Sequence, residues 1–332
     1  FDHDNQYFRH LIRFKDDKGQ PRCERMTSSK RGTERHDHKQ ELQDIMLKYS
    51  ARRRFMDKIV TIFVIVCIVA AIIPLASILV EVIKNGVSAI SMEFLTQPPG
   101  SLMSGRGGIG PAIQGTLIVV GLASLIGAPI GVLAGIYLSE FAGNGIFPSV
   151  VRLFNDVLTG LPSIVVGIVG YIVLVLTIGS FSVWAGALSL SIIMIPIVVR
   201  VTEETIKIVP NSIREAGHSL GIPKWKITLY IVLKSAKSGV LTGIILSISR
   251  IAGETAPLIM TILGTSLFFS SLTGPVDALP LRIWRLASQP YESAHAAGWG
   301  AALILVTMFL ALSISLRILA QKKGFTVTRT TI

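Results

Sequence analysis

The sequence predicts an all-α integral membrane protein with six transmembrane helices and a polar N-terminal tail. Half of the 332 residues are hydrophobic, only 16% are charged, and the mean hydropathy is +0.61. Several apolar runs reach the roughly 20 residues that a helix needs to cross a bilayer. Lys and Arg cluster between these runs. A set of soluble domains is excluded, because the charged residues are too clustered along the sequence to cover the surfaces of several such domains.

The apolar runs divide the chain into three parts. A polar, basic tail at 1–58 is expected to be flexible, a transmembrane domain covers 59–320, and a C-terminal tail covers 321–332. The six predicted spans are 59–80, 112–138, 157–178, 183–199, 239–263 and 298–320.

The distribution of Lys and Arg predicts the orientation, because positive residues are retained on the cytoplasmic side. The segments 1–58, 139–156, 200–237 and 317–332 hold fifteen, one, seven and four of them, whereas 81–111 and 264–297 hold two each. We therefore place both termini and the 200–237 loop in the cytoplasm, with the spans in the plasma membrane. The net charge of +12 reflects this topology. Nucleic-acid binding is excluded, because no binding motif accompanies the basic residues. The tail also carries ten acidic residues beside its fifteen basic ones.

The beginning of the sequence is expected to be partly non-native. It opens with Phe1, which is expected of a fragment, a processed chain or an over-extended reading frame. Met26 would serve as a start, and in the last of these cases residues 1–25 are not native sequence. His36 and His38 are too few to form a metal site, because no second cluster of ligands accompanies them, and a solvated tail is expected instead.

A short helix is predicted inside the 200–237 loop, around the stretch EAGHSLGIPKW. Pro210 breaks the preceding structure, and Ser212 and Glu215 have the spacing of a capping box. Gly221 followed by Pro223 predicts the end of this helix, which covers 212–221. Its apolar stripe consists of Ile213, Ala216, Gly217 and Leu220.

A helix this short is unstable alone in water, so it must dock against another surface. That surface is either the membrane domain of the same chain, as for an ordinary interfacial helix, or a soluble partner. Gly217 and Gly221 would allow another backbone to come close.

Two pairs of opposite charges accompany the predicted spans. Arg250 and Glu254 lie four residues apart, so they are expected to share one helix face and to pair. Each ionisable group at the membrane centre costs about 2.5–3.5 kcal/mol, so such groups normally face a bundle interior or a water-filled path. An ion pair that only fastens helices is the alternative. Arg200 and Glu203 lie one turn apart at the cytoplasmic end of the fourth span, where surface anchoring is the alternative to a role in a path.

Glycine and proline positions predict packing and kinks. Gly127, Gly131 and Gly135 make two consecutive Gly-x-x-x-Gly steps, which favour close helix packing. Pro162 and Pro196 within spans, and Gly253 with Pro257 around Arg250, predict kinks or unwound backbone beside a cavity.

Two nucleotide-binding motifs are excluded. The string GRGGIG at 105–110 has Gly-x-Gly-x-x-Gly spacing, but no strand precedes it and a span follows at once, so a dinucleotide site is excluded. The sequence contains no Walker A motif, so ATP hydrolysis by this chain is not expected.

The 212–221 helix resembles the EAA loop of ABC-importer permeases. Glu215-Ala216-Gly217 is followed by Gly221 and then by Ile231-x-Leu233, and the pattern usually has Ala at Gly217 and Pro at Lys234. Strings between 107 and 320 also resemble the PstA-type phosphate permeases. They are GGIGPAIQGT (107–116), GLPSIVVGI (160–168), RVTEET (200–205), SRIAGETAPL (249–258) and ALPLRIW (278–284).

The resemblance implies a type I ABC-importer permease fold and a non-catalytic subunit of a phosphate importer. It implies a second homologous permease, a dimeric ABC ATPase beneath the 200–237 loop, and an extracytoplasmic phosphate-binding protein. The chain itself would bind no cofactor, and the ATPase would use ATP and Mg²⁺. Glu215, Ala216, Gly217 and Gly221 would contact that ATPase. The planar fork of Arg250 would suit phosphate oxygens and Glu254 would hold it in place, with Arg200 and Glu203 further along the path.

Other functions remain as alternatives. A permease for sulfate, molybdate or phosphonate is the nearest. A secondary transporter would be expected to carry inverted repeats and coupling charges in both halves, which the sequence lacks. A membrane scaffold would have little reason to place Arg250 and Glu254 inside a span.

Overall fold

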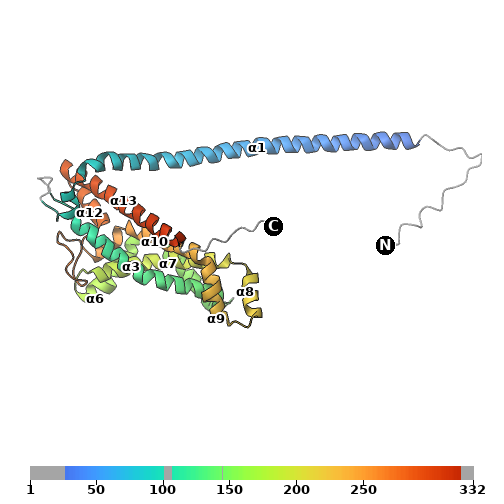
Figure 1. The fold of residues 1–332 in the computed structure, drawn as a ribbon. Helices are drawn as coiled ribbons and strands as arrows, with labels where there is room; N and C mark the ends of the chain where they lie inside the picture. Colours follow the sequence, from blue (N-terminus) through green and yellow to red (C-terminus); the bar gives the residue numbers. More distant parts are fainter. Residues whose placement is uncertain (1–26, 101–106, 144, 323–332) are drawn as a thin grey trace, which may run out of the picture. The chain divides into compact units, whose positions relative to one another are not determined.

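The computed structural model describes residues 27–100, 107–143 and 145–322, which are helical over most of their length (Figure 1). Side chains are described from residue 56 to residue 318, apart from these gaps. The alternative start at Met26 and most of the predicted C-terminal tail lie outside the described residues. The chain divides into two units, 1–76 and 77–332.

The first helix, α1 (Thr27–Gly86), joins the polar tail to the first apolar run without a break. No proline lies between residues 27 and 58, where Lys, Glu, Gln and Leu favour helix. The stretch Met56–Ala89 is long and apolar enough to cross a membrane. The boundary predicted at residue 58 is therefore not an end of secondary structure, while the flexibility of the tail stays a prediction. The side chains of His36 and His38 lie outside the described part.

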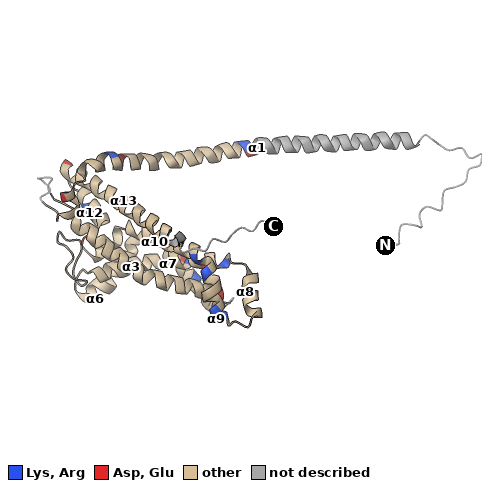
Figure 2. Ribbon diagram, viewed as in Figure 1, with Lys and Arg blue, Asp and Glu red and all other residues tan. Residues whose placement is uncertain are grey.

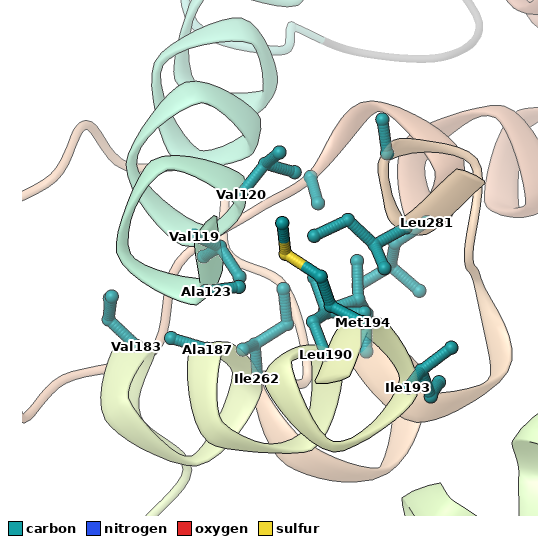
Figure 3. Packing of buried hydrophobic residues seen from close by; sticks show 14 of the residues in the cluster. Val119, Val120, Ala123, Val183, Ala187, Leu190, Ile193, Met194, Ile262 and Leu281 are labelled. Atoms are coloured by element: carbon teal, nitrogen blue, oxygen red, sulfur yellow. The ribbon is translucent and has the colours of Figure 1, made fainter. Parts of the chain in front are cut away.

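Helices α3 (Gly110–Ile136) and α7 (Val183–Lys207) pack closely along their length and form the centre of the second unit. Figure 3 shows Val119, Val120 and Ala123 on α3 facing α7. The three glycines of α3 lie in the same contact. A Cβ added at Gly127, Gly131 or Gly135 would lie 3.3, 2.7 and 2.7 Å from Met194, Val198 and Thr202 respectively.

The third predicted span is not one straight helix. α4 (Ile146–Gly160) ends where α5 (Ser163–Gly170) begins, and α5 continues through a π-helical turn (η3, Tyr171–Val175) into α6 (Leu176–Ile178). The two halves are bent by 102°. Pro162 explains the break, because proline disfavours helix at the residue before it, and Leu161 is extended. The predicted break at Pro162 is therefore confirmed, whereas α7 continues through Pro196.

The fifth span was predicted at 239–263, and its limits were wrong. A continuous helical stretch of Lys224–Ala252 comprises α9 (Lys224–Lys226), a π-helical turn (η4, Ile227–Val232) and α10 (Leu233–Ala252). The chain leaves the helix at Gly253 and starts α11 (Ala256–Thr261) with a proline in its first turn. The apolar residues after Gly253 extended the hydropathy signal beyond the end of the helix.

Three short helices lie at the two ends of the second unit. The short helix α8 (Asn211–Ser219) and α9 are at one end, and α12 (Leu279–Ala287) is at the other (Figure 1). Charged residues gather at the α8 end (Figure 2). The other elements are η1 (Val87–Ala89), α2 (Met92–Thr96) and α13 (Glu292–Lys322).

Six membrane-crossing segments remain if the bent pair counts as one. In the described part, five helical stretches are long and apolar enough to span, and the bent pair α4–α6 is the sixth candidate. Each corresponds to one predicted span, so the number of spans agrees with the prediction while several limits do not.

Substitution of Gly131 by Ala should destabilise the protein relative to Gly121→Ala. A methyl group at Gly131 meets Val198 and the Ile195 carbonyl, whereas nothing lies within 4 Å of one at Gly121 on the same helix. Both changes gain similar helix propensity, so the overpacking remains as the difference, about 1–3 kcal/mol of unfolding free energy. Unfolding of the two variants in the same detergent measures it. Equal stabilities would contradict the close packing of α3 on α7.

Candidate functional site

A cleft of about 730 Å³ lies where the interrupted helices meet. The end of α4 and the start of α5 form one wall, and α7 and the end of α10 form the others. Most of the lining is apolar. Its polar side chains are Thr159, Ser163, Arg250 and Glu254.

The predicted pair Arg250 and Glu254 lies in this cleft. Nη2 of Arg250 is 3.6 Å from Oε1 of Glu254, so the two charges pair as predicted. They do not share a helix face, because α10 ends at Ala252 and Glu254 follows the end. The Arg250 side chain is 57% exposed and that of Glu254 is 14% exposed. Arg250 therefore keeps N–H donors available to a molecule in the cleft.

The start of α5 adds positive potential at the same place. Ser163 is the first residue of α5 and lines the cleft, and Pro162 before it makes no side-chain cap bond. The first amides of a helix lack partners within that helix and form the positive end of its dipole. A helix start and an exposed guanidinium in one cleft are suited to an anion.

Arg200 and Glu203 lie away from this cleft, in a pocket of about 190 Å³. They do not pair with each other. Arg200 bonds Asp156 (Nη1 to Oδ1, 2.9 Å) and Glu204 (Nε to Oε1, 3.1 Å). Glu203 instead accepts hydrogen bonds from Arg152 at 2.9 Å and Lys207 at 2.6 Å, both at Oε1. The four predicted pathway residues therefore form two groups, one in each cavity.

The helix predicted at 212–221 is α8, and it begins at Asn211. The predicted capping box is wrong, because Pro210 occupies the N-cap and no side chain caps the helix. Ser212 lies one residue inside the helix instead of at its start. The predicted end is correct: Gly221 has φ +71°, and the amide of Ile222 donates to the Gly217 carbonyl at 3.3 Å. These features form a Schellman motif.

The predicted apolar stripe of α8 divides between two surfaces. Gly217 is buried against Ile227, and a Cβ at Gly217 would lie 2.9 Å from Cδ1 of Ile227. Ile213 is half-buried on the same side. Ala216 and Leu220 are exposed, Leu220 by 78%. One side of α8 therefore docks on its own domain, and the other remains available to a partner.

A buried ion pair fastens the segment before α12 at the far end of the unit. Nη2 of Arg282 lies 2.8 Å from Oδ2 of Asp277, and both side chains are almost inaccessible. Burial raises the pKa of Asp277, and Arg282 opposes that shift. The backbone comes so close to α3 that a Cβ at Gly115 would overlap the Asp277 carbonyl oxygen. Neither residue lines the Arg250 cleft or the Arg200 pocket.

Known proteins resemble this chain over most of its length. Residues 127–324 match the family described as binding-protein-dependent transport system inner membrane component. The phosphate transport system permease protein PstA of Yersinia pestis is 36% identical over 282 residues, which cover 85% of this chain and 96% of that protein. The PstA protein of Pasteurella multocida is 38% identical over 82% of this chain and 97% of its own length. That of Xylella fastidiosa strain 9a5c is 41% identical over 71% of this chain and 83% of its own length.

The chain belongs to the PstA family. The residues matched by the family, 127–324, include the cleft and α8. The predictions of a multi-pass membrane protein and of a non-catalytic transmembrane subunit are confirmed by this membership.

Solved ABC transporters share the fold at low sequence identity. A chain of a bacterial alginate ABC transporter, in complex with a periplasmic protein bound to alginate pentasaccharide, aligns with a TM-score of 0.56 at 14% identity. The alignment covers 83% of this chain and 97% of that one. A chain of a bacterial ABC transporter that imports alginate aligns with a TM-score of 0.52 at 14% identity. The alignment covers 65% of this chain and 79% of that one. The type I permease fold expected of a PstA protein is therefore present.

Several residues of this PstA-family site were not singled out from the sequence. Arg152 and Asp156 are the partners of Glu203 and Arg200, and the lone basic residue of the 139–156 segment was the available signal. Arg214 and Glu140 form an ion pair across 74 residues of sequence, which no local pattern indicates.

Proposed function

We propose that this chain is the permease subunit of an ABC importer that moves inorganic phosphate across the cell membrane. The observation that carries the proposal is the similarity to PstA phosphate permeases over more than four fifths of this chain. The family match at residues 127–324 includes the Arg250 cleft. A permease for sulfate, molybdate or phosphonate remains the alternative, since a guanidinium binds any of these oxyanions.

Phosphate passes through the cleft at the break between α4 and α5. Arg250 and the first amides of α5 supply positive charge and N–H donors, and Glu254 holds the guanidinium at the cleft wall. Arg200 and Glu203 lie further along the path, at the α8 end. The contact with phosphate is transient, because a transport site must release its ion. Selectivity rests mainly in the binding protein that delivers the phosphate.

ATP hydrolysis takes place in a separate dimeric ATPase that uses ATP and Mg²⁺ and binds the exposed side of α8. Support comes from Ala216 and Leu220, which face outward while Gly217 faces Ile227. Glu215 is exposed beside them, and Gly221 gives the end of the helix its left-handed turn. ATP-driven closure moves α8 and switches the cleft between outward and inward access.

Three further features belong to the proposal. A second, homologous permease completes the path, because a path of this type needs two coupling helices and this chain supplies one, α8. A phosphate-binding protein docks at the α12 end. Both termini and the α8 end lie in the cytoplasm. The positive charges gathered at the α8 end support this orientation (Figure 2).

Arg250→Gln should reduce phosphate uptake at least tenfold without preventing membrane insertion or ATPase binding, because it removes the charge that faces the cleft. Uptake by proteoliposomes that contain the whole importer measures the effect. In the swapped double variant, with Glu at 250 and Arg at 254, uptake should stay low. Recovery in that variant would show that the pair matters only as a salt bridge.

Gly221→Val should abolish uptake by displacing the ATPase contact, since Val strongly resists φ +71°. The matched control is Gly179→Val. Gly179 also has a left-handed backbone conformation, at φ +78°, and no atom lies within 4 Å of an added Cβ. It lies away from α8, so Val there strains the backbone without affecting that helix. Both variants should insert, but only Gly221→Val should lose the hydrolysis that the loaded binding protein stimulates. Normal stimulation in Gly221→Val would reduce α8 to a packing element.

The orientation is tested by cysteine labelling in a variant that lacks Cys23 and Cys67. A cysteine at the exposed Ser219 should react only with a membrane-permeant thiol reagent, whereas one at the exposed Ser271 should react with an impermeant reagent as well. Labelling of both positions from outside would overturn the proposed topology.

A further inference from the structure

Arg214 of α8 uses all five of its N–H donors. Nε and Nη2 donate to Oε1 of Glu140 at 3.0 and 2.6 Å. Nη2 also donates to the Ile206 carbonyl at 3.0 Å, and Nη1 donates to the Val209 carbonyl at 2.6 Å and to Oδ1 of Asn211 at 3.2 Å. The Glu140 side chain is 5% exposed and that of Arg214 is 19% exposed. A planar guanidinium held in this way has one orientation.

These bonds connect three elements at one point. Ile206 lies in the last turn of α7, and Val209 follows that helix. The Ile206 carbonyl also accepts a hydrogen bond from the Val209 amide at 3.1 Å, so Arg214 is bonded directly to the backbone at the end of α7. Glu140 lies in the π-helical turn η2 (Tyr137–Phe141) that continues α3. Any rotation of α8 must therefore move η2 and the end of α7, or break a buried ion pair.

The same turn is bonded to α4. Nη2 of Arg152 on α4 donates to the Leu138 carbonyl in η2 at 3.0 Å, while its Nε bonds Glu203 on α7. At its far end, α4 supplies Leu158 and Thr159 to the wall of the cleft. A continuous series of hydrogen bonds and rigid helix thus connects α8 to the cleft.

We propose that Arg214 and Glu140 are positioning residues that form the joint through which α8 moves the cleft. Motion of α8 passes through this pair to η2, from η2 through Arg152 to α4, and from α4 to the cleft wall. The π-helical turn serves as the hinge, because its irregular hydrogen bonding makes it a place where a helix changes direction. The inference rests on the proposed function, in which α8 receives the motion of the ATPase.

The other contact of α8 is less suited to this role. Gly217 meets Ile227 through apolar surfaces, which have no directional bonds. A fork with five donors instead fixes distance and direction together. The pair therefore transmits motion, whereas the apolar contact keeps α8 close to the domain.

Glu140→Gln and Arg214→Lys test the joint in the complete importer, reconstituted in proteoliposomes with its ATPase and binding protein. Glu140→Gln removes the charge, and Arg214→Lys keeps the charge but loses the fork. The control is Lys237→Gln, an exposed cation on α10 outside the joint. The quantities measured are copurified ATPase, hydrolysis rate, and phosphate moved per ATP hydrolysed.

The expected result is loss of coupling without loss of assembly. Copurified ATPase should stay within twofold of wild type, whereas phosphate moved per ATP should fall at least tenfold in both variants. The double variant should be no worse than the poorer single variant, because both changes break one interaction. Lys237→Gln should match wild type. If uptake falls only in proportion to the amount of assembled complex, the pair is a fastener and the proposal is wrong.

Accessibility of the cleft supplies an independent readout. In a cysteine-free background, the reaction of Thr159→Cys with a small thiol reagent should respond to MgATP with vanadate, and Glu140→Gln should abolish that response. A retained response would overturn the joint. Failure of the unsubstituted importer to take up phosphate would instead contradict the proposed substrate, and the labelling response would still decide whether the joint acts.

Discussion

The close contact between α3 and α7 determines the geometry at both ends of the second unit. Helices in lipid gain little from hydrophobic burial against one another, so their association depends on close van der Waals packing at small residues. Gly127, Gly131 and Gly135 provide such a surface over successive turns. Because η2 continues α3 and the α8 loop continues α7, this packing also sets the separation that Arg214 bridges.

The interrupted helices satisfy a second constraint. Backbone that leaves a helix within a membrane is tolerated only where it is covered by protein or lines a water-filled cavity. The breaks after Gly160 and after Ala252 meet at the cleft, and α5 and α11 cover each other. The contact is close enough that a Cβ at Gly167 would lie 2.9 Å from the Pro257 backbone. The features that break the helices therefore also produce the cavity that makes the breaks tolerable.

Local signals in the sequence were reliable where local forces decide the structure. Spans follow from hydropathy, the close packing of α3 from glycine spacing, and the end of α8 from Gly221. The capping box failed because Pro210 already starts the helix, which leaves Ser212 inside the first turn. The partner of Arg214 is 74 residues away and is brought close only by the packing of α3 on α7, so no local pattern contains it.

The two arginines of the proposed mechanism differ in the way their tasks require. Arg214 is 19% exposed, with a nitrogen 2.6 Å from a buried carboxylate and no donor left over. Arg250 is 57% exposed, and its nitrogen is 3.6 Å from Glu254. A joint must keep its partner through every cycle, whereas a transport site must bind its ion weakly enough to release it. An arginine bound as completely as Arg214 would have no donor to offer phosphate. The looser pairing of Arg250 therefore suits a passing anion, and the saturated pairing of Arg214 suits the transmission of force.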